Sequence, residues 1–112
     1  MRVSVLGVDD PAFLEELRER IPDASLRRRA RSDLLFVGFD ERSRLTRLGA
    51  HKDFIAPDGA VWVIWPKSSK AIDENDVRDA ALAVGLVDVK VVAFSATHSA
   101  LKLVIPLARR LR

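Results

Sequence analysis

The residues best suited to binding an anion follow the most apolar segment of the chain. Residues 60–65 (AVWVIW) are followed by a proline and then by four polar residues, Lys67, Ser68, Ser69 and Lys70. Ammonium and hydroxyl groups donate hydrogen bonds to phosphates and carboxylates. However, no glycine stands beside the lysines to form an anion-binding nest, and Asp73 and Asp76 follow. The competing interpretation is therefore a solvated connecting loop whose lysines aid solubility.

Carboxylates follow two other predicted strands and could bind a cation or perform acid–base chemistry. They are Asp9, Asp10, Asp40 and Glu41. Asp10 precedes Pro11, and Asp40 precedes a second predicted helix, so N-capping explains both without any ligand. No serine lies in a GxSxG context, there is no cysteine, and the two histidines are far apart. We predict no catalytic residue and no metal site, and we interpret His98 as a turn residue.

A cluster of arginines could bind phosphate groups of a nucleic acid. It comprises Arg27, Arg28, Arg29 and Arg31. The net charge of +3 and the isoelectric point of about 9.8 are compatible with such a partner but do not require it. Alternatively, the arginines flank an edge strand and discourage its pairing with another molecule.

Length and composition favour one globular domain over residues 1–112. The chain is 48% hydrophobic and 31% charged, and it contains no cysteine, which excludes disulfides and thiolate metal sites. No apolar stretch approaches the roughly 20 residues of a membrane helix, and the first residues do not resemble a signal peptide. We therefore expect a cytoplasmic protein without a membrane partner.

Apolar runs bounded by turn signals predict six strands, at residues 3–8, 24–31, 33–39, 60–65, 88–94 and 100–107. Helices are predicted at residues 11–20, from about residue 41, and at residues 73–84, where Gly85 provides a C-cap. Gly49 either ends or interrupts the second helix, and His51 beyond it is expected to be exposed. The spacing of Trp62 and Trp65 places them on opposite faces of one strand, most simply in the core.

The central strand is predicted to begin after a turn at Pro57, Asp58 and Gly59, with Gly59 at a positive φ. The last two strands have a short connection and should form an antiparallel hairpin. Helices between the other strands imply parallel crossovers. The predicted fold is α/β: a Rossmann-like three-layer sandwich with a mostly parallel sheet of about six strands and a C-terminal antiparallel hairpin.

Two resemblances accompany this pattern. The phrase APDGAVWVIWP is similar to the Pro-Gly-Gly turn and following strand of S-adenosylmethionine-dependent methyltransferases. Over nearly the whole chain, the segments LLFVGF, APDGAVWVIWPK, DVRDAALAVGLVDVKV and SALKLVI resemble an uncharacterised bacterial family, the domain of unknown function 3052. The resemblance implies a truncated methyltransferase-like fold and no established activity.

The sequence departs from the methyltransferase pattern at three ligand-contacting positions. The turn after the first strand, residues 6–10, has one glycine and two carboxylates instead of a glycine-rich sequence. Residues 29–32 carry no acidic residue to accept hydrogen bonds from a ribose, and Phe39-Asp40-Glu41 replaces a polar-Pro-Pro-aromatic loop. We therefore expect no cofactor bound in the usual mode.

The sequence thus predicts a non-catalytic module that contacts another protein, a second copy of itself or a small ligand. The alternatives are a degenerate methyltransferase-like enzyme or nucleotide-binding protein that uses the loops after the first, third and fourth predicted strands, and a basic protein associated with nucleic acid.

Overall fold

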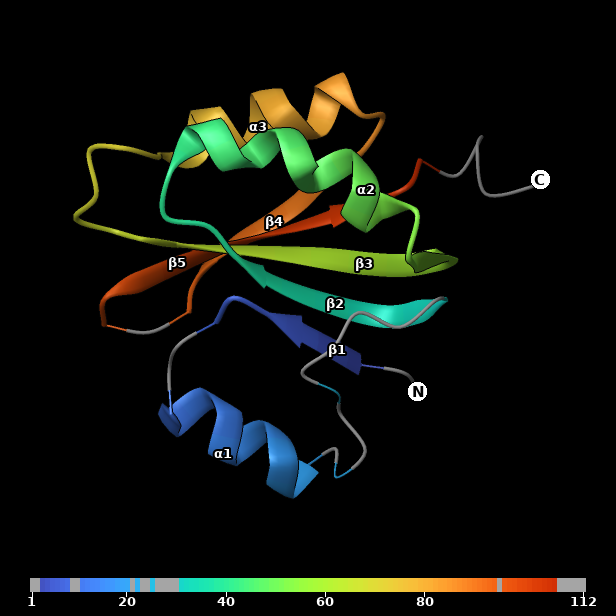
Figure 1. Cartoon of the computed structure of the whole chain (residues 1–112), viewed down its shortest axis with the longest axis vertical. Helices are drawn as coiled ribbons and strands as arrows, with labels where there is room; N and C mark the ends of the chain where they lie inside the picture. The colour runs from blue at the N-terminus through green and yellow to red at the C-terminus, as the bar shows by residue number, and fades with distance from the viewer. Residues whose placement is uncertain are drawn as a thin grey trace.

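A computed structural model describes residues 3–8, 11–20, 22, 25, 31–94 and 96–106 of the chain. Within these residues, five strands form one sheet in the spatial order β1-β2-β3-β5-β4. Figure 1 shows α2 and α3 above this sheet and α1 below it, which makes three layers. In chain order the elements are β1 (Val3–Leu6), α1 (Pro11–Arg20), β2 (Ser32–Gly38), the 3-10 helix η1 (Arg42–Arg47), α2 (Leu48–Lys52), β3 (Ile55–Pro66), α3 (Glu74–Ala83), β4 (Val87–Ala93) and β5 (His98–Val104).

The sheet is mixed in direction. β1 is parallel to β2 and β2 to β3, whereas β5 is antiparallel to both β3 and β4. The predicted hairpin of the last two strands is confirmed. A mostly parallel sheet is not, because β5 inserts between β3 and β4 and makes half of the strand pairs antiparallel.

The predicted strand at residues 24–31 is not confirmed in the described part of the chain. Ser25 forms an isolated parallel bridge with Ser4 of β1. Arg31 is exposed and has a φ of 58°, a left-handed conformation that does not continue a strand. Residues 26–30, including the predicted phosphate contacts Arg27, Arg28 and Arg29, lie outside the described residues.

The main core lies between the sheet and the layer of α2 and α3. Alternate residues of the strands point into it, as the period of two along a strand requires. Trp65 is 4% exposed in this core, and Trp62, three residues earlier, is half-buried on the opposite face. The prediction of opposite faces is therefore confirmed. The core contains Leu35, Val37, Val61, Val63, Trp65, Leu101 and Leu103 from the sheet, with Leu45, Leu48, Val77, Ala81 and Leu86 from the helical layer.

The predicted turn before the central strand is wrong. Residues 57–59 belong to β3, and the register with β2 shifts here, since Ser32 pairs with Ile55 and Leu34 with Ala60. Gly59 does not have a positive φ. A Cβ on it would lie 2.9 Å from the carbonyl oxygen of Ser32, so glycine is required because β2 approaches closely.

The segment after β2 folds as a 3-10 helix that continues into a short α-helix. Leu45 and Leu48 point into the core, and Arg42, Arg44 and Arg47 are exposed. Gly49 lies inside α2 rather than at its end. His51 is half-buried next to Phe39, with ring centroids 6.1 Å apart, so the expectation of an exposed histidine is wrong.

A capping box begins α3. The Asp73 carboxylate accepts a hydrogen bond from the Asp76 amide at 2.9 Å, and the Asp76 carboxylate accepts from the Asp73 amide at 3.0 Å. Gly85 follows the helix with a φ of 80°. Arg78 pairs with Glu74 and Asp88. Desolvation lowers the pKa of Arg78, but hydrogen bonds to Asp88 and Glu74 and the attraction of both carboxylates together raise it more, and the net pKa is above its ordinary value.

Replacing Asp73 by alanine should destabilise the fold, because the Asp76 amide in the first turn of α3 loses the carboxylate that accepts its hydrogen bond. We expect the free energy of unfolding to fall by about 1 kcal/mol, measured by urea denaturation. Asp79→Ala removes the same charge from an exposed position of the same helix and should have almost no effect. Equal losses in the two variants would show that charge, not capping, is responsible.

Candidate functional site

A cavity of about 400 Å³ opens where β1, β2 and β3 end. The carboxyl ends of these strands lie on the left in Figure 1, next to the start of β5. The walls of the cavity combine glycine backbone, apolar side chains and three polar side chains. The lining residues are Gly7, Val8, Gly38, Phe39, Asp40, Arg44, Ile64, Pro66, Phe94 and His98.

The order of the strands explains why a cavity forms here. After β1 the chain passes through α1 and reaches Ser25, which bridges to Ser4 on one side of β1. It then returns to β2 on the other side, where Leu35 pairs with Ser4. When the connections after two neighbouring parallel strands run to opposite sides, they leave a gap at the carboxyl ends of those strands. This position is the switch point of the sheet, where ligands usually bind in an open α/β fold.

Two glycines bring the ends of β1 and β2 into direct backbone contact. Gly7 has a φ of 67°, and a Cβ on it would lie 3.0 Å from the carbonyl oxygen of Gly38. A Cβ on Gly38 would lie 2.8 Å from the carbonyl carbon of Gly7. No side chain fits between these strand ends, so the inner wall of the cavity is backbone.

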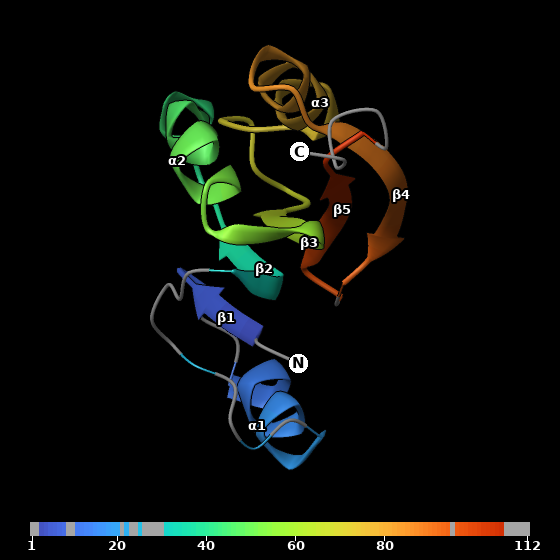
Figure 2. The same cartoon turned by 90° about the vertical axis from the view of Figure 1, so that its right-hand side faces the viewer.

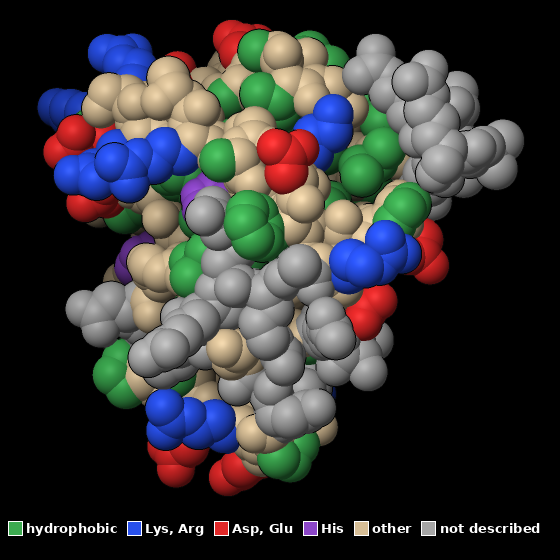
Figure 3. All heavy atoms as spheres, turned by 45° about the vertical axis from the view of Figure 1, so that its right-hand side comes forward, with side chains coloured by type: hydrophobic (Ala, Val, Ile, Leu, Met, Phe, Trp, Pro, Cys, Tyr) green, Lys and Arg blue, Asp and Glu red, His purple; other side chains and the backbone are tan. Residues whose placement is uncertain are grey.

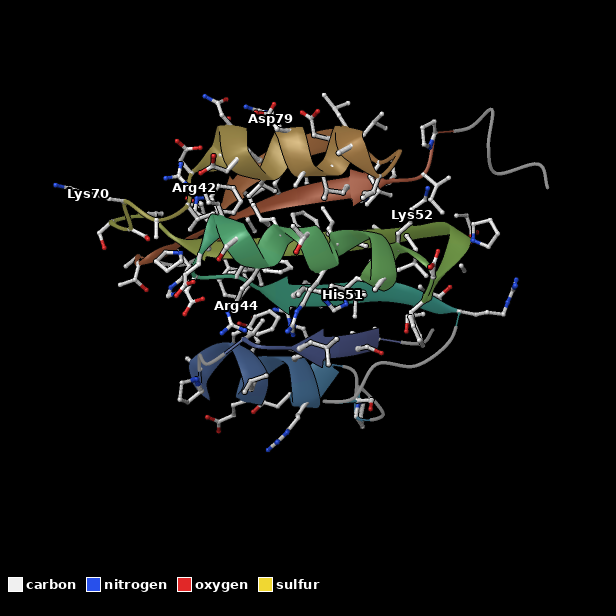
Figure 4. The ribbon with its side chains drawn as sticks, turned by 45° about the horizontal axis from the view of Figure 1, so that its top comes forward. Arg42, Arg44, His51, Lys52, Lys70 and Asp79 are labelled. Carbon is white, nitrogen blue, oxygen red and sulfur yellow. The ribbon has the colours of Figure 1, made fainter. Side chains whose placement is uncertain are left out.

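Opposite charges reach the cavity from neighbouring segments. Asp40 follows β2, and Arg44 stands on η1; both side chains are exposed. Figure 4 shows Arg44 on the side of η1 that faces β1, whereas Arg42 lies on the side that faces α3. The cavity therefore offers a hydrogen-bond acceptor and a donor to a ligand, and neither is committed to the core.

Aromatic rings and a histidine complete the lining. Phe39 is buried, and Phe94 lies 4.6 Å from Phe13 of α1, measured between ring centroids. His98 begins β5 opposite Pro66, so the interpretation of His98 as a turn residue is wrong. Its Nδ1 is 2.8 Å from the Thr97 hydroxyl, and this contact orients the imidazole.

Of the ligand-binding residues predicted from the sequence, Asp40 lines the cavity. The loop Lys67–Lys70 does not line the cavity. The Ser69 hydroxyl accepts a hydrogen bond from the Ala71 amide at 3.0 Å, and the Lys67 amide donates to the Thr97 carbonyl at 2.9 Å. The Lys67, Ser68 and Lys70 side chains are exposed. Asp9 and Asp10 lie outside the described residues, and the described residues form no cluster suited to a metal ion.

Arg44, Phe94 and His98 were missed because no local pattern connects them. Each belongs to a different segment, and the sheet order brings the segments together. The available signal was indirect: a hairpin that pairs with the central strand must place its turn beside the end of that strand. Ile64 was expected only as part of an apolar strand, whereas Phe39 was expected at the end of one, beside Asp40.

A second, shallower groove of about 300 Å³ lies between η1 and α3. It is mainly apolar, with Leu45, Ala80 and Val84 among its lining residues and Asp79 at its rim. Figure 4 shows the two helices side by side and Asp79 on the outer side of α3. The Lys52 ammonium donates to the carbonyl of Val84 at 2.7 Å, which ties α2 to the end of α3.

None of the described helices is long and apolar enough to span a membrane. No protein-family model matches the sequence, and no curated protein matches it either. Solved structures do share its fold.

The fibrillarin pre-rRNA processing protein of Methanococcus jannaschii matches 93% of this chain with a TM-score of 0.60 and 11% identity. A TehB-like SAM-dependent methyltransferase from Corynebacterium glutamicum matches 92% of it, with a TM-score of 0.54 and 14% identity. Magnesium protoporphyrin IX methyltransferase from Synechocystis, solved with bound SAM, matches 93%, with a TM-score of 0.60 and 10% identity.

These likenesses establish a methyltransferase-like Rossmann fold. The chain spans 66%, 68% and 59% of those three proteins, respectively. Sequence identities this low support a shared architecture but not a shared activity, because one fold hosts many functions.

The described residues do not fit S-adenosylmethionine in the usual mode. That mode depends on a glycine-rich turn after the first strand, where absent side chains let the backbone approach the ligand. Here Gly7 and Gly38 face each other, and the missing side chains make room for the neighbouring strand. The glycines are explained by strand packing, and no further glycine stands in residues 8–37.

Adding a methyl group at Gly38 should force the ends of β1 and β2 apart. We expect Gly38→Ala to lower the free energy of unfolding by roughly 1–3 kcal/mol, because rigid backbone atoms cannot yield as a side chain can. Thermal and urea denaturation would measure the loss.

Gly49→Ala is the matched control for this substitution. Its Cβ would lie 3.3 Å from the Cγ1 of Val84, a side chain that can shift, and alanine favours the helix. Its stability should stay close to that of the original chain. A Gly38→Ala variant as stable as Gly49→Ala would contradict the close contact.

Proposed function

We propose that this chain is a methyltransferase-like Rossmann module that binds a small ligand at the ends of β1 and β2 and transfers no methyl group. The observation that carries the proposal is the cavity at the switch point of the sheet, lined by Asp40, Arg44 and His98. A pocket with a few converging polar groups in an otherwise apolar lining is the usual form of a small-molecule site.

The lining favours a ligand with both an acidic group and a hydrogen-bond donor. The Arg44 guanidinium suits a carboxylate or phosphate, for which its planar donors are matched. The Asp40 carboxylate suits an amine or a hydroxyl. Phe39 and Phe94 favour a flat ring, because aromatic faces attract other aromatic groups. A nucleotide or an aromatic amino acid has this combination.

A catalytic methyltransferase-like enzyme is the alternative. Its support is the fold shared with SAM-dependent methyltransferases. Against it, the glycines serve strand packing, and the described residues hold no paired nucleophile and base at the cavity. Membership in the domain of unknown function 3052 and a cytoplasmic location stay predictions.

A protein partner or a second copy of the chain also stays a proposal. Three large apolar side chains support it, since Leu82, Val89 and Val91 are 65%, 55% and 45% exposed. Leu82 lies on α3, and Val89 and Val91 lie on β4, which is an edge strand of the described sheet. Lys90 and the shift in register between Asp88 and Lys90 weigh against simple edge pairing, because both features blunt an edge.

Nucleic-acid binding through the arginines near residue 30 stays a prediction, since only Arg31 of that group is described. On the face shown in Figure 3, the coloured basic side chains stand next to acidic ones, so no large patch of one charge supports it there.

A thermal-shift screen of the full chain tests the small-ligand proposal. The panel contains S-adenosylmethionine, S-adenosylhomocysteine, ATP, NAD and the aromatic amino acids. A ligand at 100 times its Kd should stabilise the fold by about 2.7 kcal/mol and raise Tm. Arg44→Gln should abolish the shift, and Asp40→Asn should reduce it.

Arg47→Gln supplies the control, because Arg47 is an exposed arginine of the same 3-10 helix and does not line the cavity. The same shift in Arg44→Gln and in Arg47→Gln would place the ligand elsewhere. Transfer of a labelled methyl group from S-adenosylmethionine to any acceptor would replace the proposal with the enzyme alternative. A panel without any shift would leave protein contact as the better function.

A further inference from the structure

One row of side chains crosses the sheet on the face opposite the main core. The strand register pairs Val5 with Phe36, Phe36 with Trp62, Trp62 with Lys102, and Lys102 with Lys90. Paired residues share a face of the sheet, so aromatic rings in the middle of the row lead directly to two lysines at its end.

The aromatic part of the row is a short stack of rings, which we call the aromatic platform. The Phe36 and Trp62 rings lie almost parallel, with an angle of 12° between their planes and 6.4 Å between centroids. Phe13 of α1 meets Phe36 edge-on at 5.3 Å and closes that end of the platform. Trp62 is half-buried, and the Lys90 ammonium lies 5.9 Å from its ring centroid.

The lysines occupy a position that a sheet normally avoids. Lys90 and Lys102 stand directly opposite each other on neighbouring strands, where like charges repel. The described ion pairs include neither lysine. An anion placed between the two ammonium groups would remove the repulsion, which makes this end of the row complementary to phosphate.

The row becomes more exposed toward the lysines: Val5 is 2% exposed, Phe36, Trp62 and Lys102 are half-buried, and Lys90 is exposed. Of the described helices, α2 and α3 pack on the other face of the sheet, and α1 lies near β1. Figure 2 shows α1 below β1 and no described helix on the side of β4 and β5 that faces away from α3. The strand register places Trp62, Lys102 and Lys90 on the face of the sheet opposite the main core.

We propose that this row binds single-stranded nucleic acid. A base stacks on the exposed part of Trp62, and the adjoining phosphates contact Lys102 and Lys90. Sheet faces that combine aromatic rings with basic residues bind single strands because every base has a stackable face and every linkage a negative charge. The Lys90 ammonium, which now lies over the indole, moves to the phosphate when the base takes its place.

The proposal is independent of the small-ligand function, since Trp62, Lys90 and Lys102 do not line the cavity. A duplex fits less well because its bases are already stacked inside the helix. An acidic peptide would satisfy the lysines and leave the aromatic platform unused, so it is an outcome that the test distinguishes.

Tryptophan fluorescence tests the stacking step. The chain has two tryptophans, Trp62 and Trp65. A Trp65→Phe variant has Trp62 as its single indole, and its emission should be quenched on titration with poly(U) or poly(dT). Should this core substitution prevent folding, quenching of the unmodified chain can be compared with that of Trp62→Phe, which should lose most of the signal. Unchanged emission at saturating oligonucleotide would overturn stacking on Trp62.

Anisotropy of a labelled 12-nucleotide single strand tests the lysines. Lys90→Gln/Lys102→Gln should weaken binding at least tenfold and lower the slope of log K against log salt by roughly 1.4, at about 0.7 per phosphate contact. The matched control is Arg18→Gln/Arg47→Gln, which removes two charges from exposed sites on α1 and η1 and should retain most of the affinity.

Three outcomes would overturn the proposal. The first is an equal loss in the lysine pair and in the arginine pair, which would indicate attraction by net charge alone. The second is equal affinity for a duplex of the same length. The third is binding of poly-glutamate that competes with the oligonucleotide and quenches Trp62 to the same extent, which would assign the row to acidic proteins.

Discussion

The arrangement of this protein depends on the pairing of β3 on both of its edges. β3 has twelve residues and joins β2 in parallel and β5 in antiparallel direction. The antiparallel partner begins where β3 ends, so His98 comes to lie opposite Pro66, beside the carboxyl ends of the parallel strands. A parallel partner would have placed its carboxyl end there instead. The polar lining of the cavity therefore follows from strand direction as much as from side-chain identity.

The same strand separates two surfaces of different character. Its core-facing residues, Val61, Val63 and Trp65, are almost fully buried under the helices. On the other face, Ile64 lines the cavity and Trp62, two residues earlier, belongs to the row that leads to the lysines. The two proposed sites thus adjoin along one strand. The cavity has a backbone wall, so we expect it to select ligands by fit, whereas we expect the row, which is exposed at Lys90, to select by stacking and charge.

The fold resembles that of methyltransferases, and the chemistry at its switch point differs. Glycines at such strand ends commonly let a ligand approach the backbone. Here the backbones of β1 and β2 instead pack against each other in the space that side chains at Gly7 and Gly38 would occupy. Asp40 and Arg44 line the cavity from the segment after β2 and from the 3-10 helix, respectively. A fold can keep the place where ligands bind and change what it offers them, because the place depends on topology and the contacts depend on a few residues.

The sequence by itself determined the α/β class, the closing hairpin and the ends of α3, because these follow from apolar periodicity and local capping bonds. Asp73 and Asp76 act on each other at the start of α3, and Gly85 acts at its end, so the local sequence is enough to predict their roles. Only the tertiary structure decided that Gly59 packs against β2, that His98 joins the cavity and that Lys90 faces Lys102. Each of these depends on strand order and register, which arise from contacts between segments distant in sequence.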